Sequence, residues 1–340
     1  MTRSESSGRS TFTTVCILTA IILGVLFACK RQVPEPEDDT RVPSPSLARD
    51  SVIRSILARI QPDSIRATVE VLQGFGSRFA LAPSRDSVAV WIEEQFRRRG
   101  FDQVVRDSFL LSYAFRGHLT ETWQKNVVAT FRGSNLPGST IVIGAHYDSA
   151  TRPDDPLVTT NAPGADDNAS GTAAVLEIAR VTKVAGWTPE ITVKFVAFAA
   201  EEVGYMGSED YAGKARAAAT NVRLAINLDV IAYSGAPSEG DSVGISYYPD
   251  FPNVTVVAAS IVQKFTVLVP NNIGYLVSDD SRFVAWGYPA VGFIEDFPLS
   301  PYHHSREDVV TNCNFEYCAE ITRAACAMLV QYSFADNNLP

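Results

Sequence analysis

Residues 140–148 have the sequence TIVIGAHYD, a run with almost no polar face that is followed directly by a histidine and, two residues later, by an aspartate. Ile191–Ala200, Leu224–Val230 and the shorter Val291–Ile294 are further apolar runs of this kind. Continuous apolar runs are typical of strands buried on both faces, as in a mainly parallel sheet. Residues 140–148 therefore predict a central strand of a sheet that is covered on both sides.

Helical patterns lie before and between these runs. Apolar residues recur at helical spacing in three early segments, at Ile53, Ile56, Leu57 and Ile60, at Ile65, Val69 and Leu72, and at Val88, Trp91, Ile92 and Phe96. Further helices are predicted at Gly171–Val184, Ser208–Ala219 and Phe315–Ser333. Alternating strands and helices predict an α/β fold, in which a mostly parallel central sheet is sandwiched between helices in three layers.

The first 28 residues have the pattern of a signal peptide. Arg3 and Arg9 precede an apolar run from Val15 to Ala28, which is too short to span a hydrocarbon core of ~30 Å at ~1.5 Å per residue. The run ends in Leu26-Phe27-Ala28-Cys29, which resembles the bacterial lipobox, whose cysteine is lipidated. We therefore expect an exported protein, either secreted or held in the bacterial cell envelope, with contact to the membrane only through a lipid on Cys29.

A tether separates this segment from the folded part of the chain. Residues 30–46 contain four prolines and four acidic side chains, a composition that buries no core. We expect the lipidated cysteine and tether at 29–47 and one large domain at 48–340. The chain carries 29 basic and 38 acidic residues, a formal charge of −9, and no basic block, so nucleic acid is not an expected partner.

Three cysteines remain in the expected domain, an odd number that leaves at least one unpaired. Cys313 and Cys318 are close enough in sequence to form a small loop disulfide in an oxidising compartment. Cys326 lies in an apolar stretch and is predicted to be a small buried residue.

Acidic residues and histidines follow each apolar run. The segments at these strand ends are His146-Tyr147-Asp148, Glu201-Glu202, Asp229 and Tyr302-His303-His304, and an acidic glycine-bounded loop, Gly164–Gly171, lies between the first two. Ligands of open α/β sheets bind at the carboxyl edge of the strands. Each feature alone is more often a turn, a helix cap or a solvated pair. Four of them at successive strand ends indicate a common site.

Together these segments resemble the metallopeptidases of family twenty-eight, the secreted bacterial di-zinc aminopeptidases and their relatives. The similarity runs in the family's order from about Phe75 to the C-terminus, and it is carried by His146-x-Asp148, Gly164–Gly171, Glu201-Glu202, Asn227-Leu228-Asp229, Ser278-Asp279 and His304-Ser305-x-x-Asp308. The resemblance implies a zinc-exopeptidase-like fold, peptide substrates and removal of N-terminal residues by metal-activated water.

The resemblance also implies a ligand set for two Zn²⁺ ions per chain. His146 and Asp229 would hold one ion, Glu202 and His304 the other, and Asp167 would bridge both. Two neutral imidazoles and three carboxylates leave one positive charge on two Zn²⁺ ions, which a bridging hydroxide would neutralise. Mixed nitrogen and oxygen ligands with an open water position are typical of catalytic zinc.

Two catalytic helpers follow from the same resemblance. Glu201 would be the general base, taking the proton of the attacking water and passing it to the leaving amine. Asp148 would accept the imidazole N–H of His146 and fix its tautomer.

At one position the family pattern can be matched in two ways, and at another the chain differs from it. The His-x-x-x-Asp spacing selects His304 as the ligand, but Tyr302-His303 also fits the Tyr-His pattern of the family. Asp280 stands where relatives often carry a histidine, so altered substrate contacts are expected there.

Two other classes of function share this fold. A glutaminyl-cyclase-like enzyme would use a single zinc to cyclise N-terminal glutamine, and its metal content would distinguish it. A non-catalytic surface receptor would be expected to lack Glu201 or one of the ligands, and all of these residues are present.

Overall fold

The computed structural model describes residues 47–152, 154–235, 241–275 and 277–335. The signal-peptide pattern, Cys29 and nearly all of the tether lie outside these residues. The described residues belong to one compact unit. Within the described part of the chain, no helix is long and apolar enough to cross a membrane.

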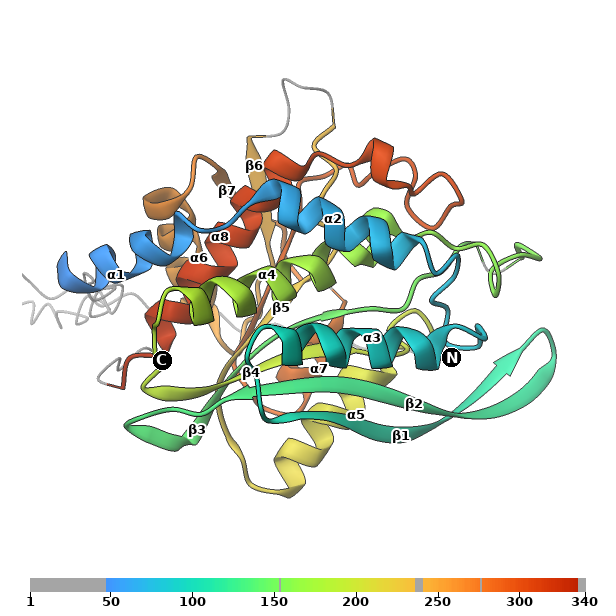
Figure 1. The fold of residues 1–340 in the computed structure, drawn as a ribbon, viewed down its shortest axis with the longest axis horizontal. Coiled ribbons are helices and arrows are strands. Elements are labelled where there is room, and N and C mark those ends of the chain that lie inside the picture. The colour runs from blue at the N-terminus through green and yellow to red at the C-terminus, as the bar shows by residue number, and fades with distance from the viewer. Residues whose placement is uncertain (1–46, 153, 236–240, 276, 336–340) are drawn as a thin grey trace, which may run out of the picture. The chain divides into compact units, whose positions relative to one another are not determined.

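The described strands form one eight-stranded sheet in the order β1-β2-β4-β3-β5-β8-β6-β7 (Figure 1). The strands are β1 Val104–Phe115, β2 His118–Phe131, β3 Leu136–His146, β4 Ile191–Phe198, β5 Asn221–Leu228, β6 Ser242–Ile245, β7 Val269–Asn272 and β8 Ala290–Glu295. The four runs that the sequence predicts as buried strands are β4, β3, β5 and β8, and they are adjacent and mutually parallel. The prediction of a mostly parallel centre is confirmed.

The two edges of the sheet are antiparallel additions. At one edge, β1 and β2 form a long hairpin whose second strand runs antiparallel to β4. At the other edge, β6 pairs antiparallel with β8 and parallel with β7. The whole sheet is therefore mixed around a parallel core.

Eight α-helices are described, and most follow the predicted segments. They are α1 Leu47–Leu57, α2 Pro62–Gln73, α3 Arg85–Arg98, α4 Gly171–Val184, α5 Met206–Ala217, α6 Pro252–Phe265, α7 Asp279–Ala285 and α8 Phe315–Tyr332. The acidic loop before α4 forms a short helical segment, η1 Ala165–Ser170, which is interrupted by non-helical backbone at Asp167 and Asn168. A 3₁₀ turn, η2 Val310–Asn312, precedes α8.

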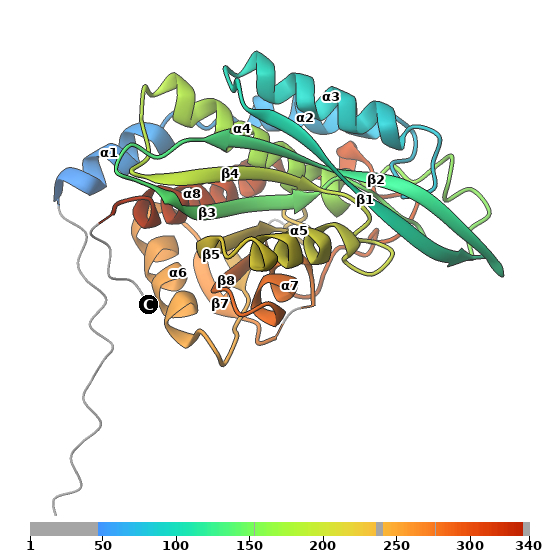
Figure 2. The same cartoon turned by 90° about the horizontal axis from the view of Figure 1, so that it is seen from below.

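Helices cover both faces of the sheet, as the apolar strands require (Figure 2). Alternate residues of a strand point to opposite faces. Ile141 and Ile143 of β3 belong to the main core cluster, which also contains residues of α1, α2, α3, α4, α6 and α8. Val142 between them belongs to a second cluster that contains residues of α5 and α7. The predicted three-layer arrangement is confirmed.

The disulfide considered from the sequence does not form. Cys313, Cys318 and Cys326 are all free. Cys318 is completely buried on α8 and packs in the main core cluster, whereas half-buried Cys313 precedes the residue that caps this helix. The prediction that Cys326 is buried is confirmed.

Candidate metal centre

One half of the centre lies at the carboxyl ends of β3 and β5. His146 is the last residue of β3, and only 1% of its surface is exposed. Its Nε2 lies 3.0 Å from Oδ1 of Asp229, the residue after β5, and 3.3 Å from Oδ1 of Asp167 in η1. The parallel register of β3 and β5 places His146 and Asp229 at one edge of the sheet.

The other half lies beside it and shares one carboxylate with it. Nε2 of His304 lies 3.0 Å from Oε2 of Glu202 and 3.2 Å from Oδ2 of Asp167. Asp167 therefore offers Oδ1 to His146 and Oδ2 to His304. The result is two imidazole–carboxylate pairs joined by one carboxylate, in the pairing that the family resemblance implies.

These side chains fit the requirements of bound zinc. Their ligand atoms lie within 4.8 Å of one another in three overlapping sets, which are Asp167, His303 and His304, then His146, Asp167 and Glu202, and then His146, Glu201 and Asp229. Imidazole nitrogen together with carboxylate oxygen is a donor set that zinc takes. Oε1 of Glu202 is buried and has no hydrogen-bond partner among the described residues, which leaves it free to bind a cation.

Two neighbouring histidines reach the shared carboxylate. Nδ1 of His303 lies 3.2 Å from Oδ2 of Asp167, and the rings of His303 and His304 stack with centroids 3.9 Å apart. The ion pairs among the described residues join Glu202 to His304 and not to His303. This second contact favours His304 as the ligand that completes the second pair.

Asp148 holds the segment that carries the two glutamates. Its Oδ1 accepts the main-chain N–H of Glu201 at 3.0 Å, and its Oδ2 accepts that of Glu202 at 3.2 Å. The partner of Nδ1 of His146 is the main-chain oxygen of Asp148, at 3.1 Å, while Oδ1 of this residue is 3.6 Å away. The expected contact to the imidazole thus comes from the Asp148 backbone, because its carboxylate is committed to Glu201 and Glu202.

Glu201 is placed beside the first imidazole. Its Oε2 lies 3.9 Å from Nε2 of His146, and 9% of Glu201 is exposed. Glu201 and Glu202 lie three and four residues after the end of β4 and line the same cavity. The carboxylate of Glu201 faces the space where a reacting group would sit.

Asp308 fixes the loop that presents Asp167. Its Oδ1 accepts the N–H of Asp166 at 2.8 Å, and its Oδ2 accepts that of Asp167 at 2.9 Å. Its main-chain oxygen accepts the N–H of Ala165 at 3.0 Å. The spacing of the His304–Asp308 motif is explained by this role, since a residue four positions after His304 orients the shared carboxylate.

The backbone is in the left-handed region at three residues of the centre that are not glycine. The φ angles are 60° at Ala200, 51° at Val230 and 52° at His304. Ala200 precedes Glu201 and Val230 follows Asp229. A β-branched residue such as Val230 rarely adopts this conformation, and such outliers concentrate at functional sites.

Arg78 holds two segments of the centre in place, and no pattern in the sequence predicts this role. The side chain is 1% exposed, and its guanidinium donates to the main-chain oxygens of Tyr147 at 2.7 Å, Pro163 at 2.6 Å and Gly164 at 2.7 Å. Burial lowers the pKa of Arg78 to about 10, a value at which the group stays charged at neutral pH. Arg78 therefore connects the segment after β3 with the loop that carries Asp167.

The centre holds more acidic groups than its histidines neutralise. Burial, together with the charge of Asp167, raises the pKa of Glu202 to about 7, and burial raises the pKa of Glu201 well above its ordinary value. Burial alone would lower the pKa of His146, but the charges of Glu201 and Asp229 hold it well above its usual range. Bound cations would relieve this excess of negative charge.

A cavity of about 260 Å³ opens over the centre. Beside the polar groups, it is also lined by four apolar side chains, Val230, Val277, Ile294 and Leu299. The expectation that Asp280 alters substrate contacts is not met, because Asp280 does not line this cavity.

The Asp280 carboxylate is buried against β8 and the residues that follow β6. Its Oδ2 accepts the hydroxyls of Tyr248 at 2.7 Å and Ser246 at 2.8 Å. Close packing against Gly292 of β8 leaves no space there for a Cβ.

The chain is similar in sequence to curated proteins that are named as peptidases. A probable leucine aminopeptidase of Arthroderma otae is 26% identical over 298 residues, which cover 84% of this chain and 77% of that protein. A probable zinc metalloprotease of Leptosphaeria maculans is 29% identical over 341 residues, covering 85% and 78%.

Two solved structures have the same fold. LapB of Legionella pneumophila superposes with a TM-score of 0.71 at 22% identity, over 84% of this chain and 76% of that chain. A glutaminyl cyclase of Fimbriiglobus ruber gives 0.66 at 20% identity, over 80% and 95%. The sequence itself matches the model of peptidase family M28 over residues 126–329, and because this match covers more than half of the chain and includes every proposed ligand, the chain belongs to peptidase family M28, whose members hydrolyse peptide bonds.

Proposed function

We propose that the protein is a zinc-dependent aminopeptidase that holds two zinc ions per chain. The observation that carries this proposal is the shared carboxylate, since Asp167 presents one oxygen to the His146–Asp229 pair and the other to the His304–Glu202 pair. Such a bridging carboxylate matches a two-metal site. Relatives named as aminopeptidases and zinc metalloproteases support the same assignment.

The chain's own residues supply the general base and hold it in position. Zinc bound at this site would polarise the scissile carbonyl and lower the pKa of water from ~15.7 towards ~7. Glu201 would accept the proton of the attacking water and pass it to the leaving amine. Asp148 would keep Glu201 in place through the main-chain hydrogen bond at 3.0 Å.

The cavity supports an apolar residue at the N-terminus of the substrate. Val230, Val277, Ile294 and Leu299 are among its lining residues, and burial of an aliphatic side chain against them would contribute about 1.5–3 kcal/mol. The acidic groups that line the same cavity would favour the positively charged α-amine of a peptide. We infer that leucine-like N-terminal residues are preferred over charged ones.

Metal removal and two neighbouring substitutions test the proposal together. Chelation should abolish hydrolysis of leucyl peptides, and added Zn²⁺ should restore it. Glu201→Gln should keep two zinc ions and lower kcat by at least about a hundredfold, because it keeps the shape of the side chain and removes the base. Glu202→Ala should bind one zinc ion or fewer, because it removes a ligand.

Two results would contradict the assignment. Full activity in metal-free protein would exclude the zinc mechanism, and near wild-type turnover by Glu201→Gln would exclude this residue as the base. One zinc ion per chain with release of ammonia from N-terminal glutaminyl peptides would instead indicate the cyclase alternative.

We also propose that the protein is exported and anchored through a lipid on Cys29. The basic start, the short apolar run and the lipobox-like Leu26–Cys29 support this. The mature N-terminus should be Cys29, the protein should partition into detergent, and Cys29→Ser should block processing or release it. A mature N-terminus at another residue would refute the anchor.

A further inference from the structure

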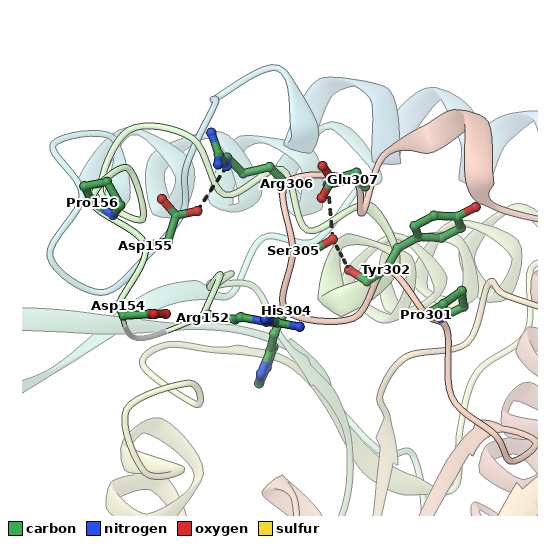
Figure 3. A pocket seen from close by; sticks show the side chains of 10 residues that line it. All are labelled: Arg152, Asp154, Asp155, Pro156, Pro301, Tyr302, His304, Ser305, Arg306 and Glu307. Atoms are coloured by element: carbon green, nitrogen blue, oxygen red, sulfur yellow. Dashed lines mark hydrogen bonds and ion pairs between the residues drawn. The ribbon is translucent and has the colours of Figure 1, made fainter.

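A second cavity adjoins the metal centre on the other side of His304. It has a volume of about 520 Å³ and is lined by residues of two loops, which are Arg152, Asp154, Asp155 and Pro156 from one and Pro301, Tyr302, His304, Ser305, Arg306 and Glu307 from the other (Figure 3). His304 is the residue that lines both this cavity and the one over the metal centre. A peptide whose first residue occupies the cavity over the metal centre could continue past His304 into this space.

Two arginines line the second cavity, and they differ in their partners. Nε of Arg306 lies 3.1 Å from Oδ2 of Asp155, so these two charges neutralise each other. Arg152 is exposed, and no carboxylate of the described residues lies within ion-pair distance of it. Figure 3 shows the Arg152 side chain extending from its loop toward His304. Of the two arginines that line this cavity with His304, Arg152 is thus the one without a carboxylate partner among the described residues.

We propose that Arg152 binds a carboxylate of the substrate on the leaving-group side of the scissile bond. A guanidinium pairs with a carboxylate through two parallel hydrogen bonds, which suits a ligand that arrives from solvent. The carboxylate is either the C-terminus of a short peptide or the side chain of an aspartate or glutamate after the first residue. This inference rests on the proposed aminopeptidase activity.

The other charges in the cavity determine the size of the effect. Asp154 and Glu307 are also exposed there, and their negative charge opposes binding of a carboxylate. Exposed ion pairs contribute little, so we expect Arg152 to favour carboxylate-bearing substrates by roughly fivefold in kcat/KM. Because Arg152 does not touch the reacting atoms, the effect should appear in KM with kcat unchanged. Asp154→Asn should raise the preference, since it removes an opposing charge.

The experiment compares matched substrates with the zinc-loaded full-length protein. One arm sets Leu-Gly, Leu-Gly-Gly and Leu-Gly-Gly-Gly against their C-terminal amides, which tests the terminal carboxylate and the chain length that reaches Arg152. The other arm sets Leu-Glu-Gly-amide against Leu-Gln-Gly-amide, which tests a side-chain carboxylate. Arg152→Gln is the test variant, and Arg152→Lys keeps the charge without the planar fork. Arg98→Gln on α3 is the control, because it removes the same charge at an exposed position that lines neither cavity.

The expected result is a preference for the carboxylate in at least one arm. Arg152→Gln should abolish it through KM, Arg152→Lys should keep part of it, and Arg98→Gln should keep all of it. Added salt should weaken the preference for the carboxylate, because charges are screened over only ~3 Å at an ionic strength of about 1 M.

Two results overturn the inference while the aminopeptidase proposal stands. The first is that the wild-type protein hydrolyses the substrate with the carboxylate and its uncharged counterpart equally well in both arms. The second is that the preference for the carboxylate survives in Arg152→Gln. Failure of the zinc-loaded wild type to hydrolyse any of these peptides would overturn the aminopeptidase proposal and this inference with it.

Discussion

Two adjacent histidines compete for the same oxygen of Asp167, and substitution can separate their roles. Both imidazoles lie 3.2 Å from Oδ2, but the contact with Glu202 at 3.0 Å is made by His304. We predict that His304→Ala loses one zinc ion and nearly all turnover, because Glu202 alone cannot complete that ligand pair. His303→Ala should keep both ions. Metal content and kcat of the two purified variants check this, and the reverse pattern would make His303 the ligand.

Asp280 gives a pH dependence that is separate from the metal. Burial raises the pKa of Asp280 to about 6, against about 3.9 in the unfolded chain. The folded state then holds this proton more tightly, so its contribution to the free energy of unfolding is full below pH ~4 and falls by about 3 kcal/mol as the pH rises to 6. Above that pH it is constant.

Asp280→Asn should remove this dependence. Urea unfolding of both proteins with chelator present, at pH 4.5 and at pH 7, measures the difference between variant and wild type. We expect this difference to shift in favour of the variant at pH 7. An equal difference at both pH values would show that Asp280 does not keep its proton on folding.

The sequence predicts the acidic and histidine residues of the site better than their supports. His146, Glu201, Glu202 and Asp229 lie at the ends of apolar strands or a few residues after them, so strand ends and residue type together place them. Arg78 binds only main-chain oxygens, and main-chain oxygens leave no pattern of side chains in the sequence. The same reason explains why Asp148 was expected to contact an imidazole and instead holds backbone N–H groups.

Among the elements, α5 is followed by an alanine, Ala219, in a left-handed backbone conformation that alanine does not favour. Ala219 has φ 52°, its N–H bonds the main-chain oxygen of Arg216 at 3.0 Å, and the N–H of Thr220 bonds that of Ala215 at 2.9 Å. This is the Schellman arrangement, in which the left-handed position is usually glycine. A left-handed alanine costs roughly 1–2 kcal/mol.

Ala219→Gly should therefore stabilise the protein. The relief of strain exceeds the entropy that glycine adds to the unfolded chain, and we expect the free energy of unfolding to rise by about 0.5–1 kcal/mol. Ala218→Gly is the control, since its φ of −82° suits alanine and glycine there should destabilise. Thermal and urea unfolding measure both, and a stability of Ala219→Gly below wild type would contradict the prediction.

The elements that the sequence predicts well are those whose apolar residues follow one clear pattern, either helical spacing or a continuous run. The predicted helix Gly171–Val184 is α4 with the same bounds. The hairpin of β1 and β2 was not predicted, because β1 and the first half of β2 are largely exposed and the only continuously buried stretch, at 126–129, is short. Helix α6 was not predicted either, although Val254, Val257, Ala258 and Ile261 have helical spacing. Its β-branched residues favour strands by propensity, and packing against α8 overrides that preference.

At the scale of the whole molecule, one buried cation joins parts of the chain that are far apart in sequence. The Arg78 guanidinium donates to the last residues of α2 through Leu72 at 3.2 Å, to the segment after β3 through Tyr147, and to the loop before η1 through Pro163 and Gly164. The latter two segments adjoin His146, the last residue of β3, and Asp167 in η1. The position of two predicted ligands thus depends on a residue that contacts neither of them.

We predict that Arg78→Met lowers both stability and zinc affinity. Four main-chain oxygens would lose a charged donor in a site closed to water, and a loss of this kind costs about 3–5 kcal/mol. Arg78→Lys keeps the charge but cannot reach all four oxygens from one ammonium group, so its cost should be intermediate. Urea unfolding in chelator measures the direct effect, and competition with a zinc chelator measures the affinity of the folded variant. If Arg78 only fills the core, zinc affinity will stay at the wild-type value while stability falls. If it also positions the ligands, affinity will fall with stability in the order wild type, Arg78→Lys, Arg78→Met, because displaced segments after β3 and before η1 no longer bring His146 and Asp167 within reach of one ion.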